Sequence, residues 1–367
     1  MEHLLFTLLI VTLIRIFYFI FFYRRVADFN IKYNHESTLL PVSIVICSRN
    51  GAHNLRRNLI DILNQEYFLF EVIVVNDNSD DDTEIFLMNL SAEYDKLVVR
   101  NIRQSSTIMK GKKYPLTIGI RATKFETILV TDADCSVVGN NWILSMAKAF
   151  NTGNEIVLGY APYKRRKGLL NKFIRFEAFF NAIQYFSYAL SGIPYMGVGR
   201  NMAYRKKLFF DHNIYPKHPG LLSGDDDLLV NAAANRNNTA VQLNPESFMY
   251  SEAKSTWSEY WNQKKRHIST AKYYKKKHQI LLLFFSFSHV MFYSLTLLLL
   301  IYSDFYLELA AIFFTRLCVE GVIYFYCMRR LHEDDLFRWF PVLDVLFLFY
   351  YFKLLPGIFN NKQVLWQ

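Results

Sequence analysis

Three long apolar runs constrain this chain more than any other feature. They cover residues 4–23, 280–302 and 305–328, and each is close to the ~20 residues that cross a bilayer core. A backbone in lipid must bond its own polar groups, so each run is predicted to be a membrane-spanning α-helix. The soluble part of the chain is therefore expected to fold between an N-terminal anchor and a C-terminal membrane region.

Basic residues flank these runs and predict their orientation. Arg24 and Arg25 follow the first run, lysines at 275–277 precede the second, and arginines at 329–330 follow the third. Because Lys and Arg accumulate in cytoplasmic loops, we expect an outside N-terminus and a C-terminal hairpin with both basic ends inside. A signal peptide fits the first run less well, since no small-residue cleavage site follows it. Residues 28–275 are then cytosolic.

A fourth apolar segment, residues 337–359, is less uniform than the other three. It contains Pro341, Asp344, Lys353 and Pro356, so it could span the bilayer or lie along its surface. In both cases the chain is predicted to be a multi-pass integral membrane protein. The bacterial cytoplasmic membrane is the expected location.

The formal net charge of +10 could indicate a nucleic-acid partner. Lys and Arg cluster, however, beside apolar segments, at 24–25, 164–167, 264–266, 275–277 and 329–330. Attraction to anionic lipid explains this placement better, so we expect membrane lipids as partners and no nucleic acid. The four cysteines are too few for a disulfide framework and are predicted to be reduced thiols in a cytosolic environment.

Short strands alternate with helices between the membrane segments. Apolar, β-branched runs predict strands at 41–46, 71–75, 96–101 and 127–130, and amphipathic patterns predict helices at 54–65, 82–94 and 114–123. This alternation with short connections predicts an α/β fold with a mostly parallel sheet covered by helices. The expected divisions are a membrane anchor (1–27), a linker (28–40), an α/β domain (41–256), a basic amphipathic interfacial helix (257–279) and a membrane region (280–367).

Two aspartates follow the strand at 127–130. Side chains alternate along an extended chain, so Asp132 and Asp134 are expected to point to the same side. Two like charges at the end of a buried strand are costly without a compensating cation or ligand, and this edge of an α/β sheet binds ligands. Oxygen ligands suit Mg²⁺ or Mn²⁺ bridging to substrate phosphates. The alternative is an acidic turn that caps a helix starting near Asn141.

Further motifs occur in order along the chain, and together they resemble one family. They are residues 43–50, 74–80, 111–113 and 131–134, then a glycine-rich segment (197–205), an acidic run (223–228) and the sequence QKKRH (263–267). In order and spacing they resemble the family 2 glycosyltransferases of the GT-A fold, including the Q-x-x-R-W motif of membrane-embedded members such as cellulose and hyaluronan synthases. Two residues depart from the pattern: Gly51 stands where an acidic residue is usual, and His267 replaces the Trp. The second departure leaves processive polymer synthesis open.

The resemblance implies roles on the donor side. Cys47 and Asp77, at the ends of the first two strands, would bind the nucleoside, and a carboxylate there can accept a uracil imide proton. Lys112 would approach the nucleotide phosphates. Asp132 and Asp134 would hold ribose and metal, with the metal neutralising the departing diphosphate. Asp77 could instead be a turn-forming residue.

The resemblance also places the catalytic base in the acidic run, with Asp226 as the candidate and Asp225 beside it. Sugar transfer with inversion needs a carboxylate opposite the leaving group to remove the acceptor proton. Asp225 and Asp227 would raise the proton affinity of Asp226 by like-charge repulsion. The run could also be the acidic start of a helix at 228–234, stabilised by the helix dipole, and both roles are compatible.

Two aromatic-rich segments have more than one interpretation. Gln263 and Arg266 share one helical face, where they could clamp the diphosphate, but their helix is also basic and aromatic, as expected at a headgroup boundary. Residues 173–188 could lie on the membrane and present an acceptor, or be buried in the protein core.

The resulting hypothesis is an inverting glycosyltransferase that moves a sugar from a nucleotide-sugar, with UDP the expected carrier. The acceptor would be a polysaccharide or a lipid-linked molecule at the cytosolic membrane face. A non-processive, glycolipid-forming transferase is a second interpretation, and a non-catalytic sugar-nucleotide sensor is a third. Retention of Asp132, Asp134 and Asp226 disfavours the sensor, because binding alone requires no base.

Overall fold

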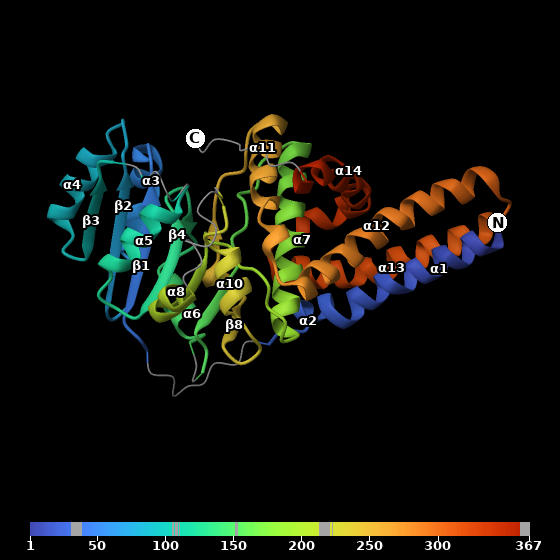
Figure 1. Ribbon diagram of the computed structural model, residues 1–367, viewed down its shortest axis with the longest axis horizontal. Helices are drawn as coiled ribbons and strands as arrows, with labels where there is room; N and C mark the ends of the chain where they lie inside the picture. The colour runs from blue at the N-terminus through green and yellow to red at the C-terminus, as the bar shows by residue number, and fades with distance from the viewer. Residues whose placement is uncertain are drawn as a thin grey trace.

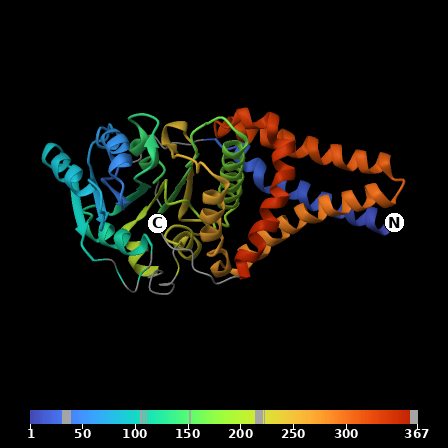
Figure 2. The same cartoon turned by 90° about the horizontal axis from the view of Figure 1, so that it is seen from above.

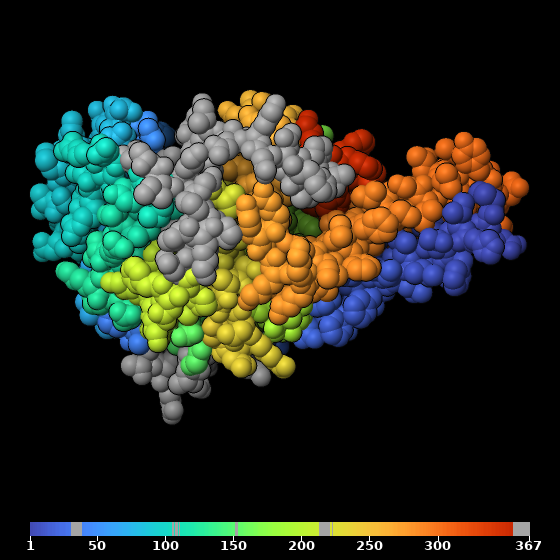
Figure 3. Space-filling model, viewed as in Figure 1, coloured from blue at the N-terminus to red at the C-terminus, as the bar shows by residue number. Residues whose placement is uncertain are grey.

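A sheet with helices on both faces forms one part of the protein, and a bundle of long helices projects from it (Figures 1 and 2). The space-filling view shows this bundle as a narrow extension of the α/β part (Figure 3). The computed structural model describes residues 1–30, 39–104, 106, 109, 111–150, 153–212, 221 and 223–359. Most of the predicted linker therefore lies outside the described residues.

Seven strands form the main sheet, in the order β3-β2-β1-β4-β7-β6-β8. Their bounds are β1 Val42–Ser48, β2 Phe70–Asp77, β3 Leu97–Ile102, β4 Thr127–Asp132, β6 Ile156–Gly159, β7 Met202–Arg205 and β8 Thr239–Gln242. β1 to β4 are parallel, whereas β7 runs antiparallel to both β4 and β6. The predicted mostly parallel α/β sheet is confirmed. A small second sheet pairs β5 (Ser136–Val137) with β9 (Met249–Tyr250).

Both faces of the sheet are buried, which explains the continuous apolar strands. Along β1, Ile44 and Ile46 pack on one face and Val45 on the other. The first face is covered by α3 (Ala52–Leu63), α4 (Thr83–Glu93) and α6 (Trp142–Ala147), which contribute to the core with Ile44 and Ile46. The second face is covered by α5 (Lys113–Ala122), α7 (Leu169–Leu190), α8 (Lys206–His212) and α10 (Asp227–Ala233).

The aromatic segment at 173–188 lies within α7 and is buried in the core. Phe180 stacks on Phe285 of a membrane helix, with ring centroids 5.5 Å apart, and Phe176 contacts Tyr324 at 5.9 Å. α7 stands between the sheet and the long helices (Figure 1). Of the two alternatives for this segment, core burial is therefore correct, and α7 joins the two parts of the protein.

Three helices among the described residues are long and apolar enough to cross a membrane: residues Glu2–Ala27, Lys276–Tyr302 (α12) and Tyr306–Arg330 (α13). The first comprises α1 (Glu2–Phe17), a π-helical turn (Tyr18–Tyr23) and α2 (Arg24–Ala27). The N-terminus and the α12–α13 turn lie together, far from the sheet (Figure 1). The basic flanks thus share the opposite end, as predicted, while the side of the membrane remains a prediction.

Charged side chains inside the bundle explain how the first apolar run tolerates Arg15. The Arg15 Nε donates to Glu320 Oε1 (2.8 Å), and Arg316 Nε donates to the same oxygen (3.0 Å). Arg316 also pairs with Asp344, and the His289 ring lies 3.1 Å from the Asp344 carbonyl oxygen. Two cations and two anions are thus buried together. Such pairing offsets the desolvation of each charge.

α14 (Phe340–Phe359) is not one of the three candidate spans. It runs across the long helices rather than along them (Figures 1 and 2) and packs on α7, α12 and α11 (Trp257–Ile268). The second alternative for this segment, a helix lying across rather than through the bilayer, agrees with this arrangement.

Candidate active site

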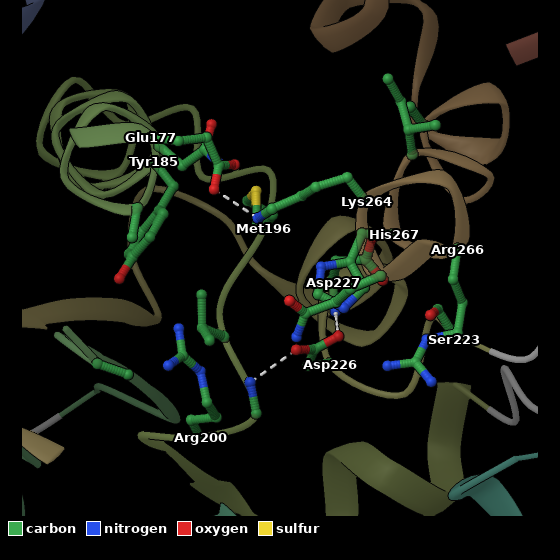
Figure 4. Close-up of a pocket in the computed structure, with 18 of the residues that line it drawn as sticks. Glu177, Tyr185, Met196, Arg200, Ser223, Asp226, Asp227, Lys264, Arg266 and His267 are labelled. Carbon is green, nitrogen blue, oxygen red and sulfur yellow. Dashed lines mark hydrogen bonds and ion pairs between the residues drawn. The ribbon is translucent and has the colours of Figure 1, made fainter. Parts of the chain in front are cut away.

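A cavity of about 1050 Å³ opens at the carboxyl edge of the sheet and extends to the membrane helices. Among the residues predicted for the site, eight line this cavity: Cys47, Lys112, Asp132, Asp134, Asp225, Asp226, Gln263 and Arg266. The first of them, on β1, and the last, on α11, are more than 200 positions apart in the sequence. The close-up in Figure 4 shows Asp226 and Arg266 facing the same space.

Strand register assembles the donor side of the cavity. Cys47 of β1 pairs with Asp132 of β4, and the adjacent Ser48 pairs with Asn76 of β2. The carboxyl ends of these parallel strands therefore coincide, as in other ligand-binding α/β sheets. Asp77, one residue beyond Asn76, is buried but is not among the residues that line the cavity. Burial raises the pKa of Asp77, and Arg49 opposes this shift.

Asp132 and Asp134 reach the cavity by different routes. Asp132 ends β4 and forms an ion pair with Lys112, directly before α5. Asp134 lies in a turn rather than an extended strand, since the Cys135 amide donates to the Asp132 carbonyl oxygen (3.1 Å). The prediction that Asp132 and Asp134 point to the same side of one extended strand is therefore wrong, although both carboxylates line the cavity.

The acidic turn does not cap the following helix. The amide of Trp142, at the start of α6, donates to Gln65 Oε1 at 2.8 Å, and the amide of Ile143 donates to the same oxygen at 3.4 Å. Gln65 thus supplies the cap, and Asp134 is available to a ligand.

The environment of Asp134 fits a divalent cation. Burial and the neighbouring Asp132 raise its pKa, which Arg200 partly opposes. Among the described residues, the Cys135 thiol at 3.6 Å is the sole hydrogen-bond donor to its carboxylate. No cluster of three or more His, Cys, Asp or Glu suited to a metal occurs in the described parts of the chain. Mg²⁺ needs no such cluster, because it commonly takes one or two carboxylates and completes its shell with substrate phosphates and water.

The three aspartates of the acidic run have different environments. Gly224 precedes them with φ of +96°, a backbone conformation that L side chains rarely adopt. Asp226 is the N-cap of α10 and accepts from the Asp227 amide (2.8 Å) and the Gly199 amide (2.6 Å). Asp227 is buried and accepts from the hydroxyls of Tyr274 (2.6 Å) and Thr270. Asp226 therefore combines the two interpretations, helix cap and cavity carboxylate, while Asp227 anchors a distant segment.

The proton affinity of Asp226 is high for a carboxylate. Burial, Asp225 and Asp227 raise its pKa from 3.8 to about 8, and the amides of Gly199 and Asp227 oppose this shift. A side chain at Gly199 would crowd this carboxylate, because a Cβ there would lie 3.3 Å from the Asp226 Cβ. A carboxylate with this pKa can accept a proton near neutral pH.

Gln263 and Arg266 project from α11, which begins with a capping box. The Glu259 amide donates to Thr256 Oγ1 and the Thr256 amide donates to Glu259 Oε2, each at 3.3 Å. The Arg266 Nε is buried without a hydrogen-bond partner, as expected of a donor that awaits an anionic ligand.

The predicted single helix at 257–279 is wrong. α11 ends at Ile268, and a short 3₁₀ turn (Ala271–Tyr273) precedes α12. Thr270 and Tyr274 bond the Asp227 carboxylate, and Tyr274 has extended backbone angles. The break follows from these contacts with the acidic run.

Several charged residues of the cavity were not among the predicted site residues, including Arg200, Glu177 and Lys264. Arg200 lies over the Tyr163 ring at 4.4 Å. Its charge adds to that of Lys112 in lowering the pKa of Asp132, and it opposes the rise in the pKa of Asp134. Glu177 of α7 and Lys264 of α11 form an ion pair of 2.5 Å across the cavity (Figure 4). Arg200 directly follows the second glycine of the glycine-rich segment, which is a usable signal. Glu177 lies in the aromatic segment at 173–188, where neither interpretation singled out a charged residue.

Comparisons with known proteins agree with this fold. Residues 43–211 match the profile of the family described as "Glycosyl transferase family 2". A mannosyltransferase from Pyrobaculum calidifontis, solved with GDP-Man and Mn²⁺, is similar in structure with a TM-score of 0.59, 13% sequence identity and coverage of 95% of this chain and 99% of that chain. At this identity the likeness shows the fold, which is GT-A.

Two curated relatives match part of the chain. A beta-monoglucosyldiacylglycerol synthase from Trichormus variabilis is 35% identical over 107 residues, which are 29% of this chain and 22% of that enzyme. A poly-beta-1,6-N-acetyl-D-glucosamine synthase from Staphylococcus epidermidis is 23% identical over 158 residues, 41% of this chain and 37% of that enzyme. The match thus spans well under half the length of either relative.

Proposed function

We propose that this chain, which carries a glycosyl transferase family 2 domain, is an inverting glycosyltransferase that uses a nucleotide-sugar, with UDP the expected carrier. The observation that supports it most is one cavity containing both a carboxylate pair at a strand end and a separate carboxylate, Asp226, with a pKa of about 8. The acceptor is a polysaccharide or a lipid-linked molecule at the cytosolic face of the bacterial cytoplasmic membrane.

The donor occupies the sheet side of the cavity. Cys47 and Ser48 border the nucleoside, Lys112 faces the phosphates, and Asp132 holds the ribose. Asp134, supported by Asp132, holds Mg²⁺ or Mn²⁺. When bound, the cation stabilises the negative charge that develops on the departing nucleoside diphosphate.

Asp226 removes the proton of the acceptor hydroxyl. The acceptor oxygen then bonds to the anomeric carbon while the bond from that carbon to the diphosphate oxygen breaks, which inverts the configuration. The Gly199 amide, 2.6 Å from Asp226 Oδ2, fixes the carboxylate in place. Positioning a base in this way contributes roughly 10²–10⁴-fold to the rate.

Arg266 and Gln263, both on α11, bind the diphosphate. The unpartnered Arg266 Nε supports this role, because a buried guanidinium donor gains most from a charged acceptor. Arg200 adds positive charge beside Asp134 and limits the repulsion between the carboxylates.

The experiment is nucleotide release by the detergent-solubilised protein, measured over a panel of sugar nucleotides with Mg²⁺ or Mn²⁺. Wild-type protein should release nucleotide from one donor and stop in EDTA. Asp226→Asn should lose roughly 10²–10⁴-fold in transfer to acceptor but still bind donor, since Asn preserves the shape of the side chain. Donor binding without turnover in the wild type, in the presence of native membranes, would instead indicate a sensor.

The two curated relatives favour different products. The relative of higher identity is named for a glucosyldiacylglycerol, the other for a polymer of N-acetylglucosamine. His267 lines the cavity where the membrane-embedded polymer synthases have Trp. This difference supports a non-processive transferase as the more specific proposal.

A further inference from the structure

The cavity does not end at the candidate base. From Asp226 it passes α7 at Glu177, Ala178 and Asn181, and then continues between α12 and α14. We call the part lined by α12 residues 282–290 and α14 residues 350–354 the membrane arm. Resting on the proposed function, we propose that the membrane arm holds the hydrocarbon chain of a lipid acceptor, whose hydroxyl group reaches Asp226.

The wall of the cavity changes from polar to apolar along this path. Near Asp226 it is lined by Gln263, Lys264 and Asn181, whereas the membrane arm is lined by Leu282, Phe287 and Val290. An occupant that fits both ends must be amphiphilic, with a polar head at the carboxylates and an apolar chain in the arm.

A polar group separates the two ends. Glu177 of α7 pairs with Lys264 of α11 and accepts from the Tyr350 hydroxyl of α14 at 3.3 Å. Three elements thus meet at one carboxylate beside the cavity. The polar head of an amphiphile would lie on the Asp226 side of Glu177, and its hydrocarbon chain would lie on the other side, in the membrane arm.

Small side chains leave room at this crossing. Ala178 and Ala182, four residues apart on α7, both line the cavity, while Phe176, Phe179 and Phe180 of the same helix pack into the core. A helical face with alanine at these positions permits a chain to pass close to the backbone.

The arm opens on the outer surface of the helices that are expected to contact lipid. Leu283 and Phe287 of α12 are 65% and 57% exposed, and Phe352 of α14 is 54% exposed, although all three line the cavity. α12 is one of the candidate membrane spans. A lipid can therefore enter sideways from the bilayer without leaving an apolar environment.

The depth of the arm fits within one leaflet. Within the arm, the lining residues of α12 run from Leu282 to Val290, a rise of about 12 Å along the helix axis. One half of the hydrocarbon core is about 15 Å thick. Among the described residues, α12 contributes no lining residue beyond Val290, and the buried Arg15, Arg316, Glu320 and Asp344 cluster fills the bundle interior. The cavity is thus a pocket reaching into one leaflet, which favours a lipid over a polymer crossing the membrane.

The test uses substitutions that fill the arm without touching the donor side. The two arm variants are Ser286→Trp, within the arm on α12, and Ala178→Phe, at the entrance to the arm on α7. Both should narrow the passage, since both residues line the cavity. Leu297→Trp is the matched control, because Leu297 lies on the same helix as Ser286, is 59% exposed and does not line the cavity. Each protein is reconstituted in vesicles of the bacterial host's total lipid with radiolabelled nucleotide-sugar.

Two readouts separate the arm from the donor site. Wild-type protein and Leu297→Trp should place label in a chloroform–methanol-soluble product, and the two arm variants should lose about tenfold or more of that transfer, as expected for a poorly fitting apolar pocket. Donor hydrolysis without acceptor should stay within about twofold of wild type in all four proteins, which also shows that they fold.

Label that stays in a water-soluble polymer, or arm variants that transfer at the wild-type rate, would overturn the membrane arm as an acceptor site. Absence of donor hydrolysis and transfer in the wild type would contradict the proposed function instead. Equal loss in Leu297→Trp would likewise overturn the proposal, because it would trace the effect to the helix rather than the cavity.

Discussion

The raised pKa of Asp226 predicts how transfer depends on pH. The base acts only when deprotonated, and with a pKa of about 8 only about 1% of it is deprotonated at pH 6. The rate of transfer, measured as kcat/KM, should therefore rise about tenfold per pH unit below this pKa and level off above it. A carboxyl with the ordinary value of 3.8 would give a flat profile over the same range.

Asp225→Asn tests the cause of this pKa. Asp225 raises the pKa of Asp226 by like-charge repulsion, second only to burial. Removing its charge should lower the midpoint of the acid limb, so the variant gains activity relative to wild type at pH 6 but not at pH 9. Asp226→Asn should instead lose transfer at every pH, by roughly 10²–10⁴-fold.

The assay is the initial rate of acceptor-dependent transfer from about pH 5.5 to about pH 9 at fixed cation concentration. The cation concentration is held fixed because a bound cation lowers the pKa of nearby carboxyl groups. Asp211→Asn is the matched control: Asp211 is paired with Lys207 at 4.0 Å on α8, away from the cavity, so its midpoint should equal that of wild type. An Asp225→Asn midpoint that stays unchanged or rises refutes the reasoning, and an inactive Asp225→Asn beside an active Asp226→Asn means that Asp225 is the base.

The same pKa has a consequence for stability. Because folding raises the pKa of Asp226 from 3.8 to about 8, the folded protein binds more protons than the unfolded chain between these values. The free energy of unfolding should therefore fall as the pH rises from about 4 to about 8. Asp226→Asn should weaken this pH dependence, as measured by thermal unfolding in detergent. An unaltered pH dependence would contradict the assigned pKa.

Four further predictions concern the cation, the base, the bundle and the topology. Asp134→Asn should lose cation-dependent donor binding in a calorimetric titration, and full wild-type activity in EDTA would contradict the metal site. Gly199→Ala should lower transfer more than donor affinity, because its Cβ would lie 3.3 Å from the candidate base; equal effects on both would argue against a role in positioning. Asp344→Asn should destabilise the bundle by about 3–5 kcal/mol in chemical unfolding, since it leaves buried cations under-compensated, and wild-type stability would show that the cluster is not cooperative. A cysteine at Glu2 should react with an impermeant reagent on intact cells and one at Asn237 should not; the reverse pattern contradicts the assigned sidedness.

Local patterns in the sequence were sufficient for the four parallel strands of the first half of the domain, whereas β6, β7 and β8 were not predicted. The positions of these four strands agree with the structure within one or two residues, because strands buried on both faces are continuous apolar runs bounded by turn residues. The three apolar spans were predicted from length and composition, and the structure has three helices that fit them. Eight of the nine site residues, most of them singled out by the family resemblance, line one cavity, and their roles remain predictions. Parallel strands that end in polar residues bring those residues to one edge of the sheet whatever the details of packing.

Contacts between distant segments decided the rest. Asp226 and Asp227 are neighbours with equal charge, and both line the cavity. The hydroxyls of Thr270 and Tyr274, more than 40 positions away, bond Asp227, whereas the Gly199 amide bonds Asp226. The partner of Arg15 is Glu320, 305 residues along the chain. Periodicity records which face of an element is apolar but not which element covers it. For the same reason, the burial of α7 and the continuation of the cavity between α12 and α14 could be seen only once the helices were packed together.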